Sequence, residues 1–182
     1  MRKNLGKKMN FLPLPVLIIG TYDENGNANA MNAAWGGIYD YNQIFVSMSK
    51  HKTTDNLEKT KAFTVSFATK NTLVASDYFG VVSGNKEDKI KKADFHAVKS
   101  NFVNAPLFEE YPLTLECTVD SFDDGTLIGN IVNVSVDDKY LTKDGKLDVD
   151  KMEIITFDMS SNTYRVLGEI VGNAFKDGFN LK

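Results

Sequence analysis

The densest group of hydroxyl and cationic side chains in the sequence is the stretch Ser47-Met48-Ser49-Lys50-His51-Lys52-Thr53-Thr54. An alternating apolar run, residues 44–48, leads into it, and a helix-forming segment that ends near Thr60 follows it. The stretch is therefore predicted to be a strand-to-helix turn, with Thr53 or Thr54 as the N-cap of the helix. Backbone N–H groups at a helix start, hydroxyl donors and two lysines supply the hydrogen bonds and the charge that a phosphate needs. The alternative is a solvated turn with an ordinary capping threonine.

A second unusual feature is the segment Ala28 to Trp35, which has the length and setting of a strand but carries mostly small side chains. Asn29, Met31 and Ala33 fall on one face, and Ala30, Asn32 and Ala34 fall on the other. Small residues weaken a strand unless something else fills the space. A flat ligand would fill it, with the two asparagines at its ring edges and Trp35 as an apolar surface. Close packing at a barrel corner, beside Gly36-Gly37, explains the same residues equally well.

A third polar stretch, residues 81–89, combines Ser83, Gly84 and Lys89 with other charged residues. Its ordinary interpretation is a solvated loop that leads into a short amphipathic helix. The single cysteine, Cys117, alternates with apolar residues and is predicted to be a core residue, not a nucleophile. With only two histidines in the chain, no metal site is expected. No catalytic residue is identified.

Composition limits the class of protein and its partners. The 182 residues, 42% apolar and 25% charged, suit one globular domain over residues 1–182. A net charge of −3 provides no general attraction for nucleic acid or acidic lipid. The apolar run Phe11 to Gly20 contains two prolines and precedes a charged turn, so it is not expected to be a signal peptide. No run approaches the ~20 residues of a membrane-spanning helix. We expect a soluble, cytoplasmic protein.

The remaining periodicity predicts a mainly β chain with short helices. Residues 1–12 are expected to form an arm or a short first strand. An Asn-Gly pair at 25–26 and the sequence Asp123-Asp124-Gly125 mark two hairpin turns. Six or seven strands with few helices indicate a closed or split barrel. The strands are predicted at residues 16–22, 28–35, 42–49, 62–68, 113–120 and 127–136, and the helices at residues 54–60 and 71–78, with Gly80 past the end of the second.

Several short motifs, weak singly but specific in this order, carry a resemblance to a known family. They are Pro15–Thr21, Asn29–Trp35, Ser47-Met48-Ser49 with Lys52-Thr53-Thr54, Ser83-Gly84 with Asp88-Lys89, Leu115-Glu116-Cys117, and Tyr164–Gly168. Together they resemble the flavin reductase-like family of FMN-binding split barrels, and within it the flavoredoxin branch. The resemblance covers most of the chain.

The resemblance implies an antiparallel, Greek-key split barrel that forms a homodimer, with FMN near the subunit boundary. Strand 28–35 would lie along the isoalloxazine ring, and Tyr164 would close the site. The phosphate would be held by Ser47, Ser49, Lys52, Thr53 and Thr54, and a second loop, at Ser83, Gly84 and Lys89, would contact the cofactor. The cofactor-binding residues that it implies are Asn29, Met31, Asn32, Ala33, Ala34, Trp35, Ser47, Met48, Ser49, Lys52, Thr53, Thr54, Ser83, Gly84, Lys89 and Tyr164.

The implied function is a flavoprotein that takes hydride from NAD(P)H onto FMN and passes electrons to a flavin or a redox protein. The alternative is an electron carrier that does not oxidise NAD(P)H directly. Many relatives carry a histidine just after the turn at residues 123–125 and an acidic residue a few positions on, where this chain has Thr126 and Asn130. This departure bears on the reductase activity and not on FMN binding. A pyridoxamine phosphate oxidase is disfavoured because Arg2 and Arg165 are the only arginines.

Overall fold

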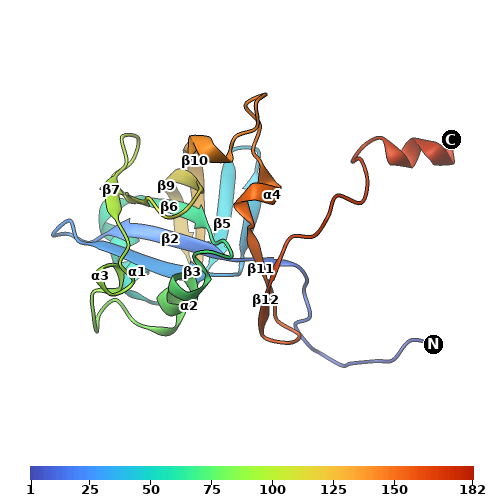
Figure 1. The fold of residues 1–182 in the computed structure, drawn as a ribbon. Helices are drawn as coiled ribbons and strands as arrows, with labels where there is room; N and C mark the ends of the chain where they lie inside the picture. The colour runs from blue at the N-terminus through green and yellow to red at the C-terminus, as the bar shows by residue number, and fades with distance from the viewer.

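The structure is a computed structural model that describes residues 1–182. It is mainly β with short helices, which confirms the sequence prediction (Figure 1). The strands are β1 (Leu14–Pro15), β2 (Leu17–Tyr22), β3 (Ala28–Ala33), β4 (Gly36–Asp40), β5 (Gln43–Ser47), β6 (Ala62–Phe67), β7 (Ala97–Lys99), β8 (Pro106–Phe108), β9 (Leu113–Asp123), β10 (Thr126–Val136), β11 (Ile155–Asp158) and β12 (Thr163–Val166). The α-helices are α1 (Lys52–Thr60), α2 (Leu73–Val81), α3 (Lys89–Lys92) and α4 (Val149–Met152), and 3₁₀ turns occupy Asp138–Tyr140 and Asp177–Leu181.

Seven strands form one antiparallel sheet in the order β3-β2-β6-β9-β10-β5-β4. β3 and β4 lie at opposite ends of this order, yet only Ala34 and Trp35 separate them in the chain. The three Cα–Cα steps from Ala33 to Gly36 span at most about 11 Å, so the sheet has to curl until its two ends meet. The β4–β5 pairing continues one residue into this corner, where the amide of Ser47 donates to the carbonyl of Trp35 at 2.7 Å. The predicted antiparallel split barrel is confirmed.

The barrel corner also explains a glycine. A Cβ on Gly36 would lie 2.9 Å from both Leu17 Cδ1 and the carbonyl oxygen of Phe45. Such contacts are too short for any side chain, so this position of β4 can hold only glycine without a shift of its neighbours.

Apolar side chains fill the barrel and cover one outer face. Ile19, Val46, Phe63 and Leu127 belong to the inner cluster, to which β3 at one end of the sheet and β5 near the other both contribute. A second cluster packs the outer face of β2 and β3 against α2 and the β11–β12 hairpin. β2 is buried on both faces, which is why its sequence is continuously apolar and not alternating.

Two helix boundaries differ from the sequence prediction. The N-cap of α1 is His51, so the predicted cap at Thr53 or Thr54 is wrong by two or three residues. The hydroxyl of Thr54 instead reaches back to the amide (3.0 Å) and the carbonyl (2.7 Å) of His51, which places it in the first turn. α2 continues to Val81, so Gly80 lies inside the helix, where a Cβ would lie 3.2 Å from Asn32 Cβ. Close packing on β3 therefore accounts for this glycine, and not helix termination.

Both chain ends extend from the barrel on the side of the small sheet β1-β11-β12 (Figure 1). Residues 1–13 form an arm without regular structure, and residues 167–176 run outward to the last 3₁₀ turn. Both segments carry exposed apolar side chains, among them Phe11, Ile170 and Phe175. None of the helices is long and apolar enough to cross a membrane.

Candidate functional site

The free edge of β3 borders a cavity of about 310 Å³, which we call the edge cavity. β3 pairs only with β2, so its other edge carries backbone N–H and C=O groups without strand partners. Residues from both faces of β3 line the cavity, which shows that it runs along the edge of the strand. Of the residues expected from the sequence, the edge cavity brings together Met31, Asn32, Ala33, Ala34, Trp35, Ser47, Met48, Ser49 and Tyr164.

α2 and β12 form the opposite wall of the edge cavity. Asn32 Nδ2 donates to the carbonyl of Ser76 at 2.9 Å, which ties β3 to α2. The Tyr164 hydroxyl donates to Asp77 Oδ1 at 2.6 Å, which ties β12 to the same helix. Burial, followed by the bond to the Asp77 carboxylate, raises the pKa of Tyr164 to about 12, so this phenol stays protonated at neutral pH.

A smaller cavity of about 80 Å³ lies at the start of α1, and we call it the helix cavity. The residues expected from the sequence that line it are Asn29, Met31, Asn32, Lys52, Thr53, Ser83, Gly84 and Lys89. Met31, Asn32, His51 and Gly80 line both cavities, so the two are continuous.

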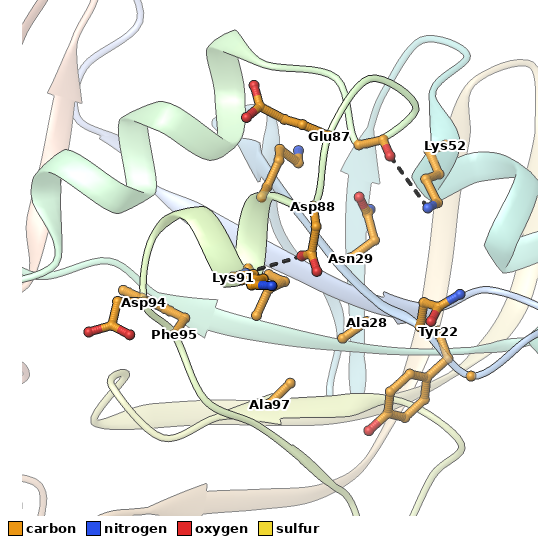
Figure 2. Close-up of a pocket in the computed structure, with 15 residues that line it drawn as sticks. Tyr22, Ala28, Asn29, Lys52, Glu87, Asp88, Lys91, Asp94, Phe95 and Ala97 are labelled. Carbon is orange, nitrogen blue, oxygen red and sulfur yellow. Dashed lines mark hydrogen bonds between the residues drawn. The ribbon is translucent and has the colours of Figure 1, made fainter.

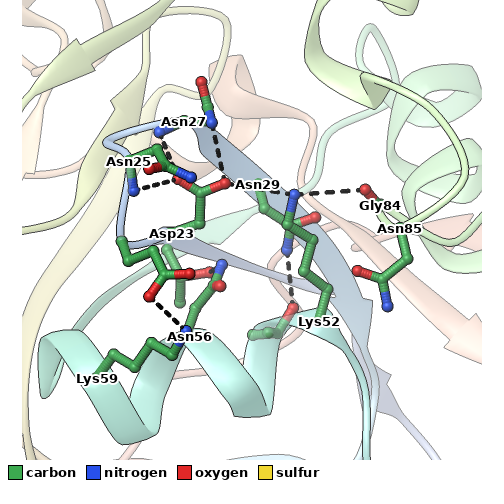
Figure 3. A network of polar contacts seen from close by, with 12 residues as sticks. Asp23, Asn25, Asn27, Asn29, Lys52, Asn56, Lys59, Gly84 and Asn85 are labelled. Atoms are coloured by element: carbon green, nitrogen blue, oxygen red, sulfur yellow. Dashed lines mark hydrogen bonds and ion pairs between the residues drawn. The ribbon is translucent and has the colours of Figure 1, made fainter.

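Two hydrogen bonds, one from β3 and one to the loop at Ser83-Gly84, hold the first turn of α1 beside the helix cavity (Figure 3). Asn29 Nδ2 donates to Thr53 Oγ1 at 3.0 Å, and Lys52 Nζ donates to the carbonyl of Gly84 at 3.4 Å. Gly84 approaches so closely that a Cβ there would lie 2.2 Å from Asn29 Oδ1. The loop at Ser83-Gly84 thus closes over the first turn of α1, and only a residue without a side chain fits at that contact.

The electrostatics of the helix cavity are unusual because two lysines meet without a carboxylate between them. Lys89 is only 4% exposed, and its Nζ donates to the carbonyl of Phe79 at 3.0 Å but forms no ion pair. Burial, and secondarily the charge of Lys52, lowers the pKa of Lys89 to about 8. Lys52 has one longer ionic contact, 3.6 Å to Asp23. Together with the free N–H groups of the first turn of α1, the two ammonium groups favour an anion.

Only part of the predicted cradle lines the helix cavity, because Ser47 and Ser49 line the edge cavity instead. Lys50 lies in a separate surface hollow with Glu58 and Asp124, so the second cation of the helix cavity is Lys89 from α3 and not Lys50. Thr54 lines that hollow as well, and its hydroxyl is engaged in the first turn of α1.

Sequence reasoning missed two polar residues. His51 lines both cavities, with Nε2 hydrogen-bonded to Ser49 Oγ at 3.1 Å. Asp77 lines the edge cavity beneath Tyr164. The position of His51 directly before a helix start was a usable signal, whereas nothing in the sequence near Asp77 distinguishes it from an exposed helix residue.

Packing accounts for part of the small-residue strand. Ala30 is fully buried in the cluster that contains Phe79 of α2, so its size is set by the close approach of that helix. Met31 and Ala33 belong to the inner cluster of the barrel. The barrel-corner interpretation therefore holds for these side chains, and the space for a ligand lies at the strand edge.

Known proteins with this arrangement identify the family. The flavin reductase like domain matches residues 9–148. Flavoredoxin of Desulfovibrio vulgaris (Miyazaki F) is 33% identical, with a TM-score of 0.94 over 98% of this chain and 100% of that chain. Flavoredoxin from Methanosarcina acetivorans is 28% identical, with a TM-score of 0.89 over 100% of both chains. An FMN-binding protein from Thermus thermophilus, 17% identical, shares the fold with a TM-score of 0.75 over 95% of this chain and 97% of that chain. Among curated protein sequences no match is found. The chain belongs to the flavin reductase-like family, in its flavoredoxin branch.

Proposed function

We propose that this protein is an FMN-binding flavoprotein, with the isoalloxazine ring in the edge cavity and the phosphate in the helix cavity. The observation that carries the proposal is Lys89, a buried lysine without a carboxylate partner that faces Lys52 across the start of a helix. Leaving a buried charge unpaired is costly unless a ligand supplies the counter-charge. The FMN phosphate carries nearly two negative charges and accepts several hydrogen bonds.

The edge cavity suits the rest of the cofactor. Its lining is mainly apolar, and its volume of about 310 Å³ lies in the range of small-molecule sites. Trp35 offers a flat surface at its mouth, and the free edge of β3 offers backbone donors and acceptors to ring heteroatoms. Family membership and the FMN-binding protein of the same fold support the same cofactor.

The phosphate assignment can be tested by comparing FMN with riboflavin, which lacks the phosphate. FMN is expected to bind more tightly by about 10-fold or more, the effect of one or more charge-assisted hydrogen bonds. Lys52→Ala should remove most of this difference and leave riboflavin binding unchanged. The matched control is Lys50→Ala, which removes a neighbouring lysine that lies outside the helix cavity. Fluorescence-quenching titrations measure all the constants, and equal affinities for FMN and riboflavin would refute the assignment.

A pH dependence should follow from Lys89. Its pKa of about 8 means that the ammonium loses its proton within an accessible range. The phosphate prefers the charged form, so the FMN dissociation constant should stay level from about pH 7, where the phosphate is already a dianion, to about pH 8, and rise above that by at most about tenfold per pH unit. Riboflavin binding should show no such slope. In Lys89→Met the slope should disappear and FMN binding should be weak throughout; an unchanged slope would assign it to another group.

We further propose that the protein oxidises NAD(P)H and passes the electrons to a free flavin or a redox-protein acceptor. Bound FMN supplies the electron-accepting chemistry, and the protein supplies orientation and electrostatics. Hydride transfer requires no obligatory acid or base, which fits a cavity whose only ionisable side chains are His51, Asp77 and Tyr164. A carrier without direct NAD(P)H oxidation is the second candidate, because Thr126, at the position of the family histidine, pairs with Ser47 at the rim of the edge cavity.

Anaerobic titration with NADH and with NADPH separates the two candidates. An enzyme should lose its oxidised-flavin absorbance with at least one of the donors, and the absorbance should return with oxygen or free flavin. Dithionite is the control for a reducible flavin. Bleaching by dithionite alone would leave only the carrier.

We also propose that the protein is a homodimer, as the family resemblance implies. Trp35, at the mouth of the edge cavity, is 54% exposed, and it is followed by the exposed Ile38 and Tyr39 of β4 and by Tyr41 of the β4–β5 turn. Apolar residues clustered on an open sheet edge are typical of an interface. The chain ends, which leave the barrel with exposed apolar residues, suit arms that wrap a second copy.

Light scattering after gel filtration should give twice the chain mass of 20.3 kDa. Ile38→Glu should shift the protein towards the monomer, because it places a charge in the proposed interface. Val98→Glu, on β7, is the matched control and should remain dimeric. A monomeric parent protein would contradict the proposal.

A further inference from the structure

The N-terminal arm, residues 1–12, concentrates positive charge at one end of the chain. It carries Arg2, Lys3, Lys7 and Lys8 and no carboxylate, because the first acidic residue of the sequence is Asp23. The other 170 residues hold 17 cationic and 24 acidic side chains, so the arm is positive on a protein that is otherwise negative. Every residue of the arm is exposed, and none of its four cations forms an ion pair.

The lysines of α3 have different surroundings. Lys91 lines an open cavity between the β2–β3 hairpin, α3 and β7, and Glu87, Asp88 and Asp94 line the same cavity (Figure 2). Carboxylates close to a lysine cancel much of its field, whereas charges of one sign that stand together add up. The arm therefore produces a positive field that the face at α3 does not.

The arm leaves the barrel at the wall of the edge cavity. Leu14 of β1 pairs with Phe157 of β11, and Leu12 and Pro13 line a hollow of about 240 Å³ that Phe157 also lines. Phe157 lines the edge cavity as well, so the hollow and the edge cavity share a wall. Six residues span at most about 22 Å, which limits the distance from Lys7 to Pro13. A small domain is about 30 Å across, so one that contacts the arm also reaches the mouth of the edge cavity.

Apolar side chains accompany the cations of the arm. Leu5, Met9 and Phe11 are 62%, 69% and 70% exposed. Protein interfaces combine apolar contacts with a charged rim, whereas a small anion makes no use of exposed apolar side chains. A second copy of the chain would bring an equal positive arm into the same assembly, whereas an acidic protein brings only the opposite charge. The composition of the arm therefore suits a protein partner with an acidic surface.

We propose that the N-terminal arm is the docking site for an acidic redox protein that accepts electrons at the edge cavity. The inference rests on the proposed FMN site and names the chemistry of its acceptor. Arg2, Lys3, Lys7 and Lys8 attract the acidic face of the acceptor and steer it towards the mouth of the edge cavity. An acceptor with a one-electron centre takes one electron, so a fully reduced flavin serves two acceptor molecules and releases its protons to water.

A basic cytochrome c and its succinylated form provide a matched pair of probes, because succinylation replaces lysine charges by carboxylates and keeps the haem. At low salt, the flavin-free protein should bind the succinylated form about tenfold more tightly than the native form. The net charge of −3 alone predicts the reverse order. High salt should abolish the difference. Calorimetric titration measures the binding, and stopped-flow haem absorbance should show faster reduction of the succinylated form by the FMN-loaded, dithionite-reduced protein.

Two full-length variants locate the effect. The arm variant combines Arg2→Gln, Lys3→Gln, Lys7→Gln and Lys8→Gln, and it should lose the preference for succinylated cytochrome c. The control variant removes the same number of charges from exposed lysines at the end of α1, on α3 and on β7, and it should keep the preference. α3 and β7 lie on the opposite side of the barrel from β11 and β12 (Figure 1). The control substitutions are Lys61→Gln, Lys91→Gln, Lys92→Gln and Lys99→Gln.

Equal binding of the two cytochromes by the parent protein, or a preference that the arm variant retains, would overturn the inference. Two further outcomes would overturn it by assigning the cations elsewhere. Loss of the dimer in the arm variant without a change in cytochrome binding would assign them to a second copy. Binding of the parent, but not the arm variant, to phosphatidylserine vesicles, without a preference between cytochromes, would assign them to a lipid surface. The predicted order of binding in a protein that takes up no FMN would support the docking site and overturn the FMN proposal.

Discussion

The corner at Ala34 and Trp35 is the constraint on which the site depends. Because two residues join strands at opposite ends of the sheet, the sheet has to close, and closure brings the end of β5 and the start of α1 beside the free edge of β3. The edge cavity and the helix cavity both lie at that meeting point. A flatter sheet with the same strand pairs would separate the free edge of β3 from Ser47 and the start of α1, and the two cavities would not form.

The buried polar contacts around α1 determine how precisely the site is held. Asn29 bonds Thr53 at 3.0 Å and Asn56 bonds Thr21 at 2.9 Å, and both bonds are buried (Figure 3). Removing one partner would leave an unsatisfied group, which costs about 1–3 kcal/mol. The exposed pair Lys59–Glu24, although shorter at 2.8 Å, contributes little because solvent screens it. α1 is therefore fixed to β2 and β3 mainly by neutral side chains. These contacts provide no counter-ion for the charge of Lys89.

Sequence patterns predicted what depends on local periodicity and missed what depends on distant contacts. Alternation and turn signals located β2, β3, β5, β6, β9 and β10 and the hairpin at Asp123-Asp124-Gly125, because a sheet imposes a period of two, but they did not predict β4 or the short strands outside the main sheet. The N-cap was misplaced because threonines are good caps, whereas Thr54 uses its hydroxyl one turn later. Lys50 was expected beside the anion because it is close to Lys52 in sequence. Only the fold shows that Lys89, from α3, occupies that place.

The open mouth of the edge cavity links binding, assembly and chemistry in this proposal. Trp35 is half exposed and borders both the cavity and the apolar β4 edge. A second copy on that edge would remove water from one side of the ring, and electrostatic interactions at a flavin strengthen as water leaves. Tyr164 and Asp77 already limit water on the α2 side through their 2.6 Å hydrogen bond.

The side left for a hydride donor or a redox partner is then the rim near Ser47 and Thr126, where this chain has a hydroxyl at residue 126 and no imidazole. Thr126 leaves space for a donor, and the one imidazole among the residues that line the edge cavity is His51, which is bonded to Ser49. In this proposal, whether the protein acts as a reductase or as an electron carrier therefore depends on access to the flavin ring at this rim and not on proton transfer.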